Sequence, residues 1–307
     1  MPVAAIDIGT NTTRLIVAEV SGGSLGELER RTVITRLGEG VDKSGVLSAA
    51  GIERVEETLS DYREIVERLG VTSTLVIATS AVRDASNGDE FLSEIERQFG
   101  FKVQLLSGTE EALLAFRGAT YGRSLMHSVL VVDIGGGSTE LVLGDAAGYS
   151  FFVSLDIGAV RLTERYLHSD PPSAAELEQC AAAVHELLAE KIPAGVLQAP
   201  NAAIGNAGTI TTLAALDQNL PEYDRERVHG YSISRQAVRE QLARLAALPL
   251  AERRQVPALE PERAPVIVAG AIVCSELLDT FALDAIEASE LDILDGAALL
   301  AAELGPS

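Results

Sequence analysis

A segment of thirteen residues near the N-terminus is repeated in the middle of the chain. Residues 5–17 (AIDIGTNTTRLIV) align with residues 131–143 (VVDIGGGSTELVL), and Asp, Ile, Gly, Thr and Leu stay in register. Each copy has an apolar strand, a turn of glycine and small hydroxyl residues, and a second apolar strand, which is the pattern of a β-hairpin. The repeat predicts two similar half-structures, and each begins with a loop whose size suits a phosphate group.

Apolar periodicity alternates between strand and helix around the two copies. Strands are predicted at 74–79, 103–106, 150–155, 201–204 and 285–291, and helices at 48–69, 87–99, 160–167, 174–191, 234–248, 266–281 and 294–304. This alternation predicts an α/β fold with a mixed sheet in each half. We expect one domain at 1–122 and a second at 123–293, with a C-terminal helix at about 294–305 that can pack back on the first.

The composition is that of a folded, acidic protein. The net charge is −21, from 24 Lys+Arg against 45 Asp+Glu, and 47% of the 307 residues are hydrophobic. Broad DNA or RNA binding is disfavoured because it needs a basic face, although a polyanion at one local site is not excluded. Cys180 and Cys274 form no metal or disulfide pattern. A basic leader and a long apolar run are both missing, so we expect a cytoplasmic protein that does not bind membranes.

Glycine and small hydroxyl residues recur in three loops. Glycine lets the backbone approach a phosphate closely, and successive N–H groups in such turns bind anions. A tight hairpin without a ligand would explain any one loop, but three together favour phosphate binding. The candidate phosphate-binding residues are Gly9, Thr10 and Asn11 in the first loop, Gly135, Gly136, Gly137, Ser138 and Thr139 in the second, and Gly208 and Thr209 in the third.

Carboxylates accompany the first two loops. Asp7 and Asp133 would repel a phosphate by about 4 kcal/mol at 4 Å if the effective dielectric is about 20. The two carboxylates are therefore compatible with a bound phosphate only if a hard cation lies between them and the phosphate. Mg²⁺ commonly uses one or two carboxylates plus substrate oxygens. Glu140 can join this metal site, whereas Arg14 occupies the equivalent place in the first copy and is a candidate phosphate ligand. An exposed strand position without a role is the alternative for these two residues.

Two further candidates follow strands. Ser107 and Glu110 have the spacing of a capping box, which leaves Glu111 free in the first turn of a helix. The helix dipole favours the anion there, so we expect Glu111 to be ionised at neutral pH and to activate a water; a solvated surface glutamate is the alternative. Arg83 follows the strand predicted at 74–79, where α/β folds place sites, and is a candidate phosphate clamp.

The segments 5–17, 79–87, 107–112, 131–140, 205–210 and 263–270 resemble, in this order, the exopolyphosphatase/guanosine pentaphosphate phosphohydrolase (Ppx/GppA) family. The length is similar to that of the short, two-domain members. The family belongs to the actin, heat-shock chaperone and sugar-kinase superfamily. The resemblance therefore implies two duplicated actin-like, ribonuclease H-like domains that have a mixed sheet each and are separated by an interdomain cleft.

The resemblance also implies roles for the candidate residues. Glu111 matches the catalytic glutamate of the family and Arg83 an arginine at the phosphate site, while Asp133 and Glu140 match residues tied to the divalent ion. The implied reaction is Mg²⁺-dependent hydrolysis of the terminal phosphoanhydride of inorganic polyphosphate, which releases orthophosphate. Phosphoryl transfer of this kind needs positioning and charge neutralisation more than covalent chemistry.

Two departures from the family pattern concern the outer parts of the site. Pro265 stands where many members have Asp, and Ala298 and Leu299 follow Leu294-Asp295-Gly296 where many have an arginine. Three alternatives remain: a pppGpp 5′-phosphohydrolase with the same active site, a superfamily kinase, and a non-catalytic binder of polyphosphate or alarmone. A homodimer is compatible with the sequence, which does not specify the oligomeric state.

Overall fold

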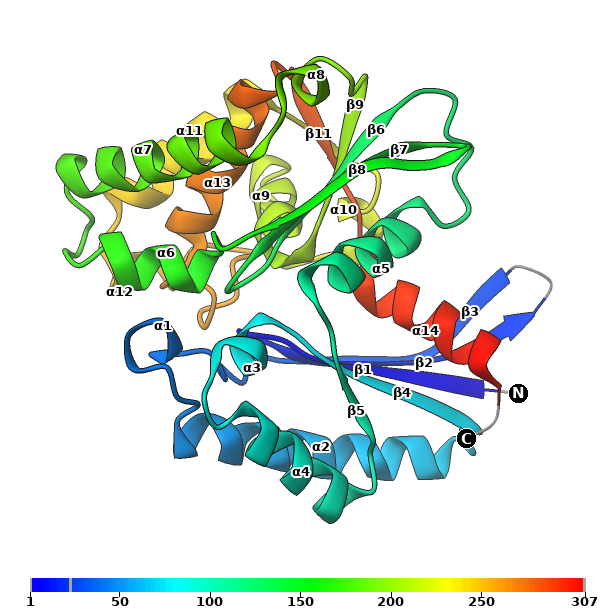
Figure 1. The fold of residues 1–307 in the computed structure, drawn as a ribbon. Helices are drawn as coiled ribbons and strands as arrows, with labels where there is room; N and C mark the ends of the chain where they lie inside the picture. The colour runs from blue at the N-terminus through cyan, green and yellow to red at the C-terminus, as the bar shows by residue number, and fades with distance from the viewer. Residues whose placement is uncertain (1, 22–23, 306–307) are drawn as a thin grey trace. The chain divides into compact units, whose positions relative to one another are not determined.

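The computed structural model describes residues 2–21 and 24–305, which fall into two compact units (Figure 1). The first unit contains the described residues up to Gly122 and those from Leu291 onward, and the second is Arg123–Glu290. The chain thus leaves the first unit after Gly122 and returns to it at Leu291. Each unit is built around one mixed β-sheet.

The sheet of the first unit has the strand order β3-β2-β1-β4-β5. Strand β1 pairs antiparallel with β2 and parallel with β4. The strands are β1 (Pro2–Ile8), β2 (Thr13–Ser21), β3 (Ser24–Val33), β4 (Ser73–Ala78) and β5 (Val103–Leu105). The helices are α1 (Val41–Ser44), α2 (Ala49–Arg68), α3 (Ser80–Asp84), α4 (Gly88–Phe99), α5 (Gly108–Thr120) and α14 (Ile293–Leu304).

Side chains of β1 alternate between two cores, as the two-residue period of a strand requires. Ile6 packs in the core that contains residues of α2 and α4, whereas Ala5 packs in the core that contains residues of α5 and α14. Helices α5 and α14 touch closely at Gly118, where a Cβ atom would lie 1.7 Å from the carbonyl oxygen of Asp292. Asp7 lies two residues after Ala5, so its side chain points to the face of α5 and α14.

The sheet of the second unit has the strand order β10-β11-β9-β6-β7-β8. The strands are β6 (Val129–Ile134), β7 (Thr139–Asp145), β8 (Gly148–Leu155), β9 (Ala202–Asn206), β10 (Ser232–Ser234) and β11 (Ala285–Ala288). The helices are α6 (Ala159–Tyr166), α7 (Ala174–Lys191), α8 (Ala194–Leu197), α9 (Ala207–Asp217), α10 (Arg225–Val228), α11 (Arg235–Ala247), α12 (Leu250–Arg253) and α13 (Ile267–Thr280).

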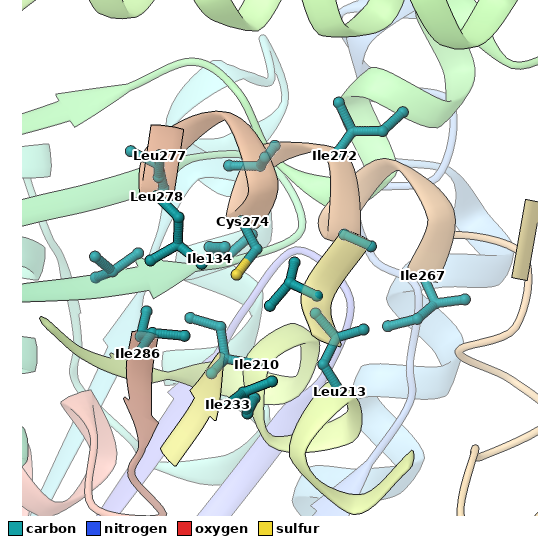
Figure 2. Packing of buried hydrophobic residues seen from close by; sticks show 14 of the residues in the cluster. Ile134, Ile210, Leu213, Ile233, Ile267, Ile272, Cys274, Leu277, Leu278 and Ile286 are labelled. Atoms are coloured by element: carbon teal, nitrogen blue, oxygen red, sulfur yellow. The ribbon is translucent and has the colours of Figure 1, made fainter. Parts of the chain in front are cut away.

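The core of the second unit lies between one face of its sheet and helices α6, α7, α9, α11 and α13. Figure 2 shows Cys274 of α13 among side chains from β6, α9 and the neighbouring strands. Cys180 lies in the same core, and both cysteines are buried free thiols. Burial raises the pKa of both to about 12, so they behave as small apolar residues.

The two sheets share one strand order. Strands β3, β2, β1 and β4 of the first sheet correspond to β8, β7, β6 and β9 of the second, with the same antiparallel and parallel pairings. The α/β fold with two similar halves is therefore confirmed. Strand β3 was not predicted, and the strand predicted at 285–291 is shorter, at Ala285–Ala288. Among the described residues, no helix is both long and apolar enough to cross a membrane.

Candidate functional site

The repeated hairpins have turns of the same geometry. Gly9 donates its N–H to the carbonyl oxygen of Thr12 at 2.9 Å, and Gly135 donates to that of Ser138 at 3.0 Å. The strands on both sides pair in equivalent registers, so that Asp7 lies opposite Arg14 and Asp133 opposite Glu140. The repeat seen in the sequence is thus a repeat of backbone geometry.

The first loop is held by three hydrogen bonds. The hydroxyl of Thr10 shares a hydrogen bond with that of Ser80, at the start of α3, at 2.9 Å. The carbonyl oxygen of Thr10 accepts from Gly38 at 2.8 Å, and that of Asn11 accepts from Arg36 at 3.0 Å. These bonds fix the loop against α3 and the segment before α1, which is what a preformed binding loop needs.

The second loop lies against the beginning of α6. Its carbonyl oxygens face this helix: that of Gly135 accepts from Ala159, that of Gly136 from Val160, and that of Gly137 from the Nε of Arg161 at 2.7 Å. In a trans peptide the N–H points opposite to the C=O, so the N–H groups that follow these carbonyls are directed away from α6. N–H groups with this direction can donate to an anion.

The third loop joins β9 to α9. Ala207 has a φ of 62°, a left-handed conformation that costs an alanine about 1–2 kcal/mol. Gly208 lies directly under the guanidinium of Arg263, since a Cβ atom there would be 1.8 Å from its Nη1. Thr209 is buried, and its hydroxyl would be 2.5 Å from a Cβ at Gly270. Arg263, which the sequence analysis noted only within a motif, is therefore part of this loop's surroundings.

Asp7 and Arg14 belong to a buried charge network in the first unit. Arg14 donates from Nε and Nη2 to Oδ2 of Asp7, at 3.1 and 2.6 Å, and from Nη1 to Asp292 at the start of α14. Arg30 of β3 reaches Asp295 of the same helix at 2.5 Å. All three kinds of guanidinium nitrogen in Arg14 bond carboxylates, so its assignment as a phosphate ligand stays a prediction.

Burial and charge compete within this network. Burial raises the pKa of Asp7 although Arg14 attracts the anion, and burial likewise raises the pKa of Asp295. Burial also acts on Asp292, but there the attraction of Arg14 and Arg30 prevails and the pKa is lowered. The other oxygen of Asp7, Oδ1, is buried without a hydrogen-bond partner in the described part of the chain. One buried oxygen of Asp7 is thus available to a cation.

Three polar side chains lie in one row across the second sheet. Glu140 on β7 is opposite Asp133 on β6, and Asp133 is in register with Asn206 on the parallel strand β9. All three are buried, and Ser154 donates to Glu140 at 2.6 Å. Two carboxylates on directly opposed residues repel each other, and a divalent cation would remove that repulsion.

The predicted metal set is divided between the two units. Asp133 and Glu140 are cross-strand neighbours in the second unit, and Asp7 belongs to the first. Over residues 2–21 and 24–305, no three His, Cys, Asp or Glu side chains are grouped as a metal site. The joint action of the three predicted ligands therefore stays a prediction.

Glu111 is located at the start of α5, after the predicted capping box. Ser107 and Glu110 make both bonds of that box, at 3.3 and 2.8 Å, and leave Glu111 free of capping. Glu111 is only 9% exposed, and Arg83 donates to its Oε2 at 3.3 Å and to the carbonyl oxygen of Leu106 at 2.8 Å. The structure thus brings together the two residues predicted to be catalytic.

The expectation that Glu111 is fully ionised at neutral pH is wrong. Burial raises its pKa to about 7, with a further contribution from Asp7, and the attraction of Arg83 only partly opposes this. The cost of desolvating the carboxylate exceeds the stabilisation that the helix dipole supplies. A carboxylate with a pKa near 7 is well matched to general-base chemistry at neutral pH.

The two departures from the family pattern have local structural roles. Pro265 lies two residues before α13, where it precedes the helix and removes none of its hydrogen bonds. Leu299 is 8% exposed on α14 and belongs to the buried side of that helix.

Comparisons with known proteins find the same family along nearly the whole chain. A model of the Ppx/GppA phosphatase family matches residues 16–299. Exopolyphosphatase 2 of Mycobacterium tuberculosis (strain ATCC 25618 / H37Rv) is 39% identical over 311 residues, which covers 97% of each chain. The crystal structure of an exopolyphosphatase-like protein, 35% identical, has a TM-score of 0.93 and covers 99% of this chain and 100% of that one. An Aquifex aeolicus member of the Ppx/GppA family, 32% identical, has a TM-score of 0.82 over 99% and 97% of the two chains.

Proposed function

The chain belongs to the Ppx/GppA phosphatase family and is a phosphoanhydride hydrolase, and on that premise we propose that its substrate is inorganic polyphosphate. In the proposed reaction a water attacks the terminal phosphorus, a new P–O bond forms, the bridging P–O bond breaks, and orthophosphate is released. The chain shortened by one phosphate is the other product.

The observation that carries this proposal is the pair of Glu111 and Arg83. A buried carboxylate with a pKa of about 7 is half ionised at neutral pH and can accept the proton of the attacking water. Arg83, held by Leu106 and Glu111, places a guanidinium beside that carboxylate, where it can bind a phosphate oxygen and position it for attack. A base beside an anion-binding arginine is the arrangement that directing water at phosphorus requires.

The glycine loops supply the binding of the remaining charge. The second loop directs the N–H groups of Gly136, Gly137 and Ser138 away from α6, where they can donate to phosphate oxygens. Thr209 and Gly208 present the start of α9 in the same way, with the positive end of its dipole. These backbone donors let an acidic chain of net charge −21 hold an anionic substrate without a broad basic surface.

A divalent cation fits the carboxylates of this chain. Asp133 and Glu140 face each other across two strands, and Asp7 keeps one buried oxygen without a hydrogen-bond partner in the described residues. We propose that these residues hold Mg²⁺, either directly or through its waters. When bound, the ion would neutralise charge that develops on the phosphate oxygens.

The experiment is a comparison of Glu111→Gln with Glu110→Gln. Both substitutions replace a glutamate in the first turn of α5, and glutamine retains the capping function at 110. We expect Glu111→Gln to lower the rate of orthophosphate release from long-chain polyphosphate by about 10²–10⁴-fold, with binding retained, and Glu110→Gln to leave the rate near that of the natural protein. Equal rates for the two variants would remove Glu111 from the mechanism.

The substrate alternatives are separated by a panel with and without Mg²⁺. Orthophosphate release from polyphosphate and from pppGpp is measured at equal concentrations, and a strong preference for the nucleotide would replace polyphosphate as the substrate. Phosphate that appears on an added acceptor would indicate a kinase. Tight binding of polyphosphate without any release would indicate a non-catalytic binder.

A further inference from the structure

Asn206 is buried at the junction of β9 and α9 with neither polar atom of its amide in a hydrogen bond. Its side chain is 0% exposed, and both Oδ1 and Nδ2 are without a partner among the described residues. An amide offers two N–H donors and a carbonyl acceptor, so burial without partners carries the full desolvation penalty. A side chain kept in this state calls for a ligand that supplies both a donor and an acceptor.

Capping of α9 does not explain Asn206. Asparagine is among the preferred N-cap residues, and Asn206 occupies the N-cap position of α9 in an extended conformation, with φ −126° and ψ −171°. Its side chain nevertheless makes no capping bond, whereas Ser107, Ser173 and Asp292 cap their helices. The amide is therefore directed somewhere other than the first turn of its own helix.

The register of the sheet shows what lies beside the amide. Asn206 is in register with Asp133 on the parallel strand β6, and Asp133 is opposite Glu140 on β7. In-register residues of neighbouring strands lie about 4.8 Å apart and point to the same face. Ile204, two residues earlier on β9, and Val131 on β6 are in register on this face, and neither belongs to the core that the helices of the second unit cover. Asn206 is thus the neutral end of the row formed by the two predicted metal ligands.

The chemistry of this row selects the ligand. Two carboxylates exclude a bare anion, and an amide donor is of little use to a bare cation. A phosphate that carries a divalent cation satisfies both, because a metal-bound water can donate to Oδ1 while a phosphate oxygen accepts from Nδ2. The strained Ala207 and the glycine that follows it bring the first N–H groups of α9 to the same place.

We propose that Asn206 is a positioning residue that holds the metal-bound phosphate between the third loop and the carboxylates of Asp133 and Glu140. This role rests on the proposed function and adds to it a residue of the segment 205–210 that was not among the predicted site residues. It accounts for an amide that the fold leaves without partners. The amide is the part of the row that distinguishes a metal–phosphate pair from the metal alone.

The test has two readouts, and only one of them requires a ligand. The variants are Asn206→Leu, which has a similar size, and Asn206→Ala, with Asn201→Leu in the exposed turn before β9 as the control. In metal-free protein we expect Asn206→Leu to raise the thermal midpoint of unfolding by about 2–4 °C, because the unpartnered amide is removed. The control should leave the midpoint unchanged.

The second readout is the affinity for Mn²⁺ together with imidodiphosphate, measured through the spectrum of the bound Mn²⁺. The bridging nitrogen of imidodiphosphate resists hydrolysis. We expect both Asn206 variants to bind this pair about 10–100-fold more weakly than the natural protein, and the control to bind it equally well. If the natural protein and the Asn206 variants bind alike, the role of Asn206 is overturned and the proposed function stands. If the natural protein does not bind the pair at all, both are overturned. A lowered thermal midpoint with unchanged affinity would make Asn206 an ordinary core residue and would also overturn the role.

Discussion

Replacing Glu111 by glutamine should stabilise the protein while it lowers the rate of orthophosphate release, and the gain in stability should depend on pH. The carboxyl has a pKa of 4.5 in an unperturbed chain and about 7 in the folded protein, where burial is the largest cause. A change of one in pKa corresponds to about 1.4 kcal/mol. The ionised Glu111 therefore destabilises the folded state by about 3 kcal/mol.

The sign of this pH dependence of stability follows from proton linkage. Between pH 4.5 and 7 the folded state binds more protons at Glu111 than the unfolded state, so the free energy of unfolding falls as the pH rises. The penalty is complete only above the folded pKa of about 7. Over pH 5 to 8.5, the free energy of unfolding of Glu111→Gln should rise relative to that of the natural protein by roughly 2–3 kcal/mol.

The assay is urea unfolding at several pH values, with Glu110→Gln as the matched control. The pKa of Glu110 is lowered, chiefly by the hydrogen bond from the Ser107 backbone, so its stabilising effect is lost only in acid, below this range. The control difference should therefore stay nearly flat from pH 5 to 8.5. A flat difference for Glu111→Gln would show that burial does not control this carboxyl, and the reasoning about its catalytic pKa would fail with it.

Three further substitutions test the surroundings of the site. Gly118→Ala forces α5 and α14 apart, because the new Cβ would lie 1.7 Å from the carbonyl oxygen of Asp292, and should lower the free energy of unfolding by at least 1–3 kcal/mol in urea. Asp292→Asn leaves Arg14 buried without one of its carboxylates and should cost about 3–5 kcal/mol in the same assay. Gly208→Ala displaces the guanidinium of Arg263 from the third loop and should raise KM for polyphosphate about tenfold, with kcat less affected.

Controls for these substitutions are available within the chain. At Gly195 an added Cβ would meet nothing within 4 Å. Gly195→Ala should therefore change the free energy of unfolding by no more than a few tenths of a kcal/mol and should leave KM unchanged. If Gly118→Ala is equally silent, the close packing of α5 and α14 does not exist in solution. If Asp292→Asn is silent, Arg14 is not held as the structure has it.

The sequence predicts features whose cause is local. The repeated hairpins, the capping box of Ser107 and Glu110 and helix α7 all appear as predicted, because strand alternation and capping depend on neighbouring residues. Strand β3 has charged residues on an exposed edge and no apolar face, so its alternation gives no signal. It forms because β2 offers it a partner along its whole length.

The charge state and the buried contacts depend on distant residues and could not be predicted in this way. Arg14 meets Asp292 across 278 positions of sequence, and no local pattern connects them. The first turn of α5 predicts an ionised Glu111, but packing buries the side chain and raises its pKa to about 7. The unpartnered amide of Asn206 is likewise visible only once β9 lies beside β6.

The position of α14 at the end of the chain has a consequence for synthesis. Residues of this helix, including Ile293 and Leu294, supply much of the core on one face of the first sheet, whose strands are among the first residues made. At roughly 5–20 residues per second, the ribosome adds the 278 residues between Arg14 and Asp292 in about 14–56 seconds. The unit that contains the first strands is therefore completed only when α14 is made, and until then α5 covers that apolar face of its sheet only in part. A chain that stops before Ile293 would lack α14 and would leave that part of the face open.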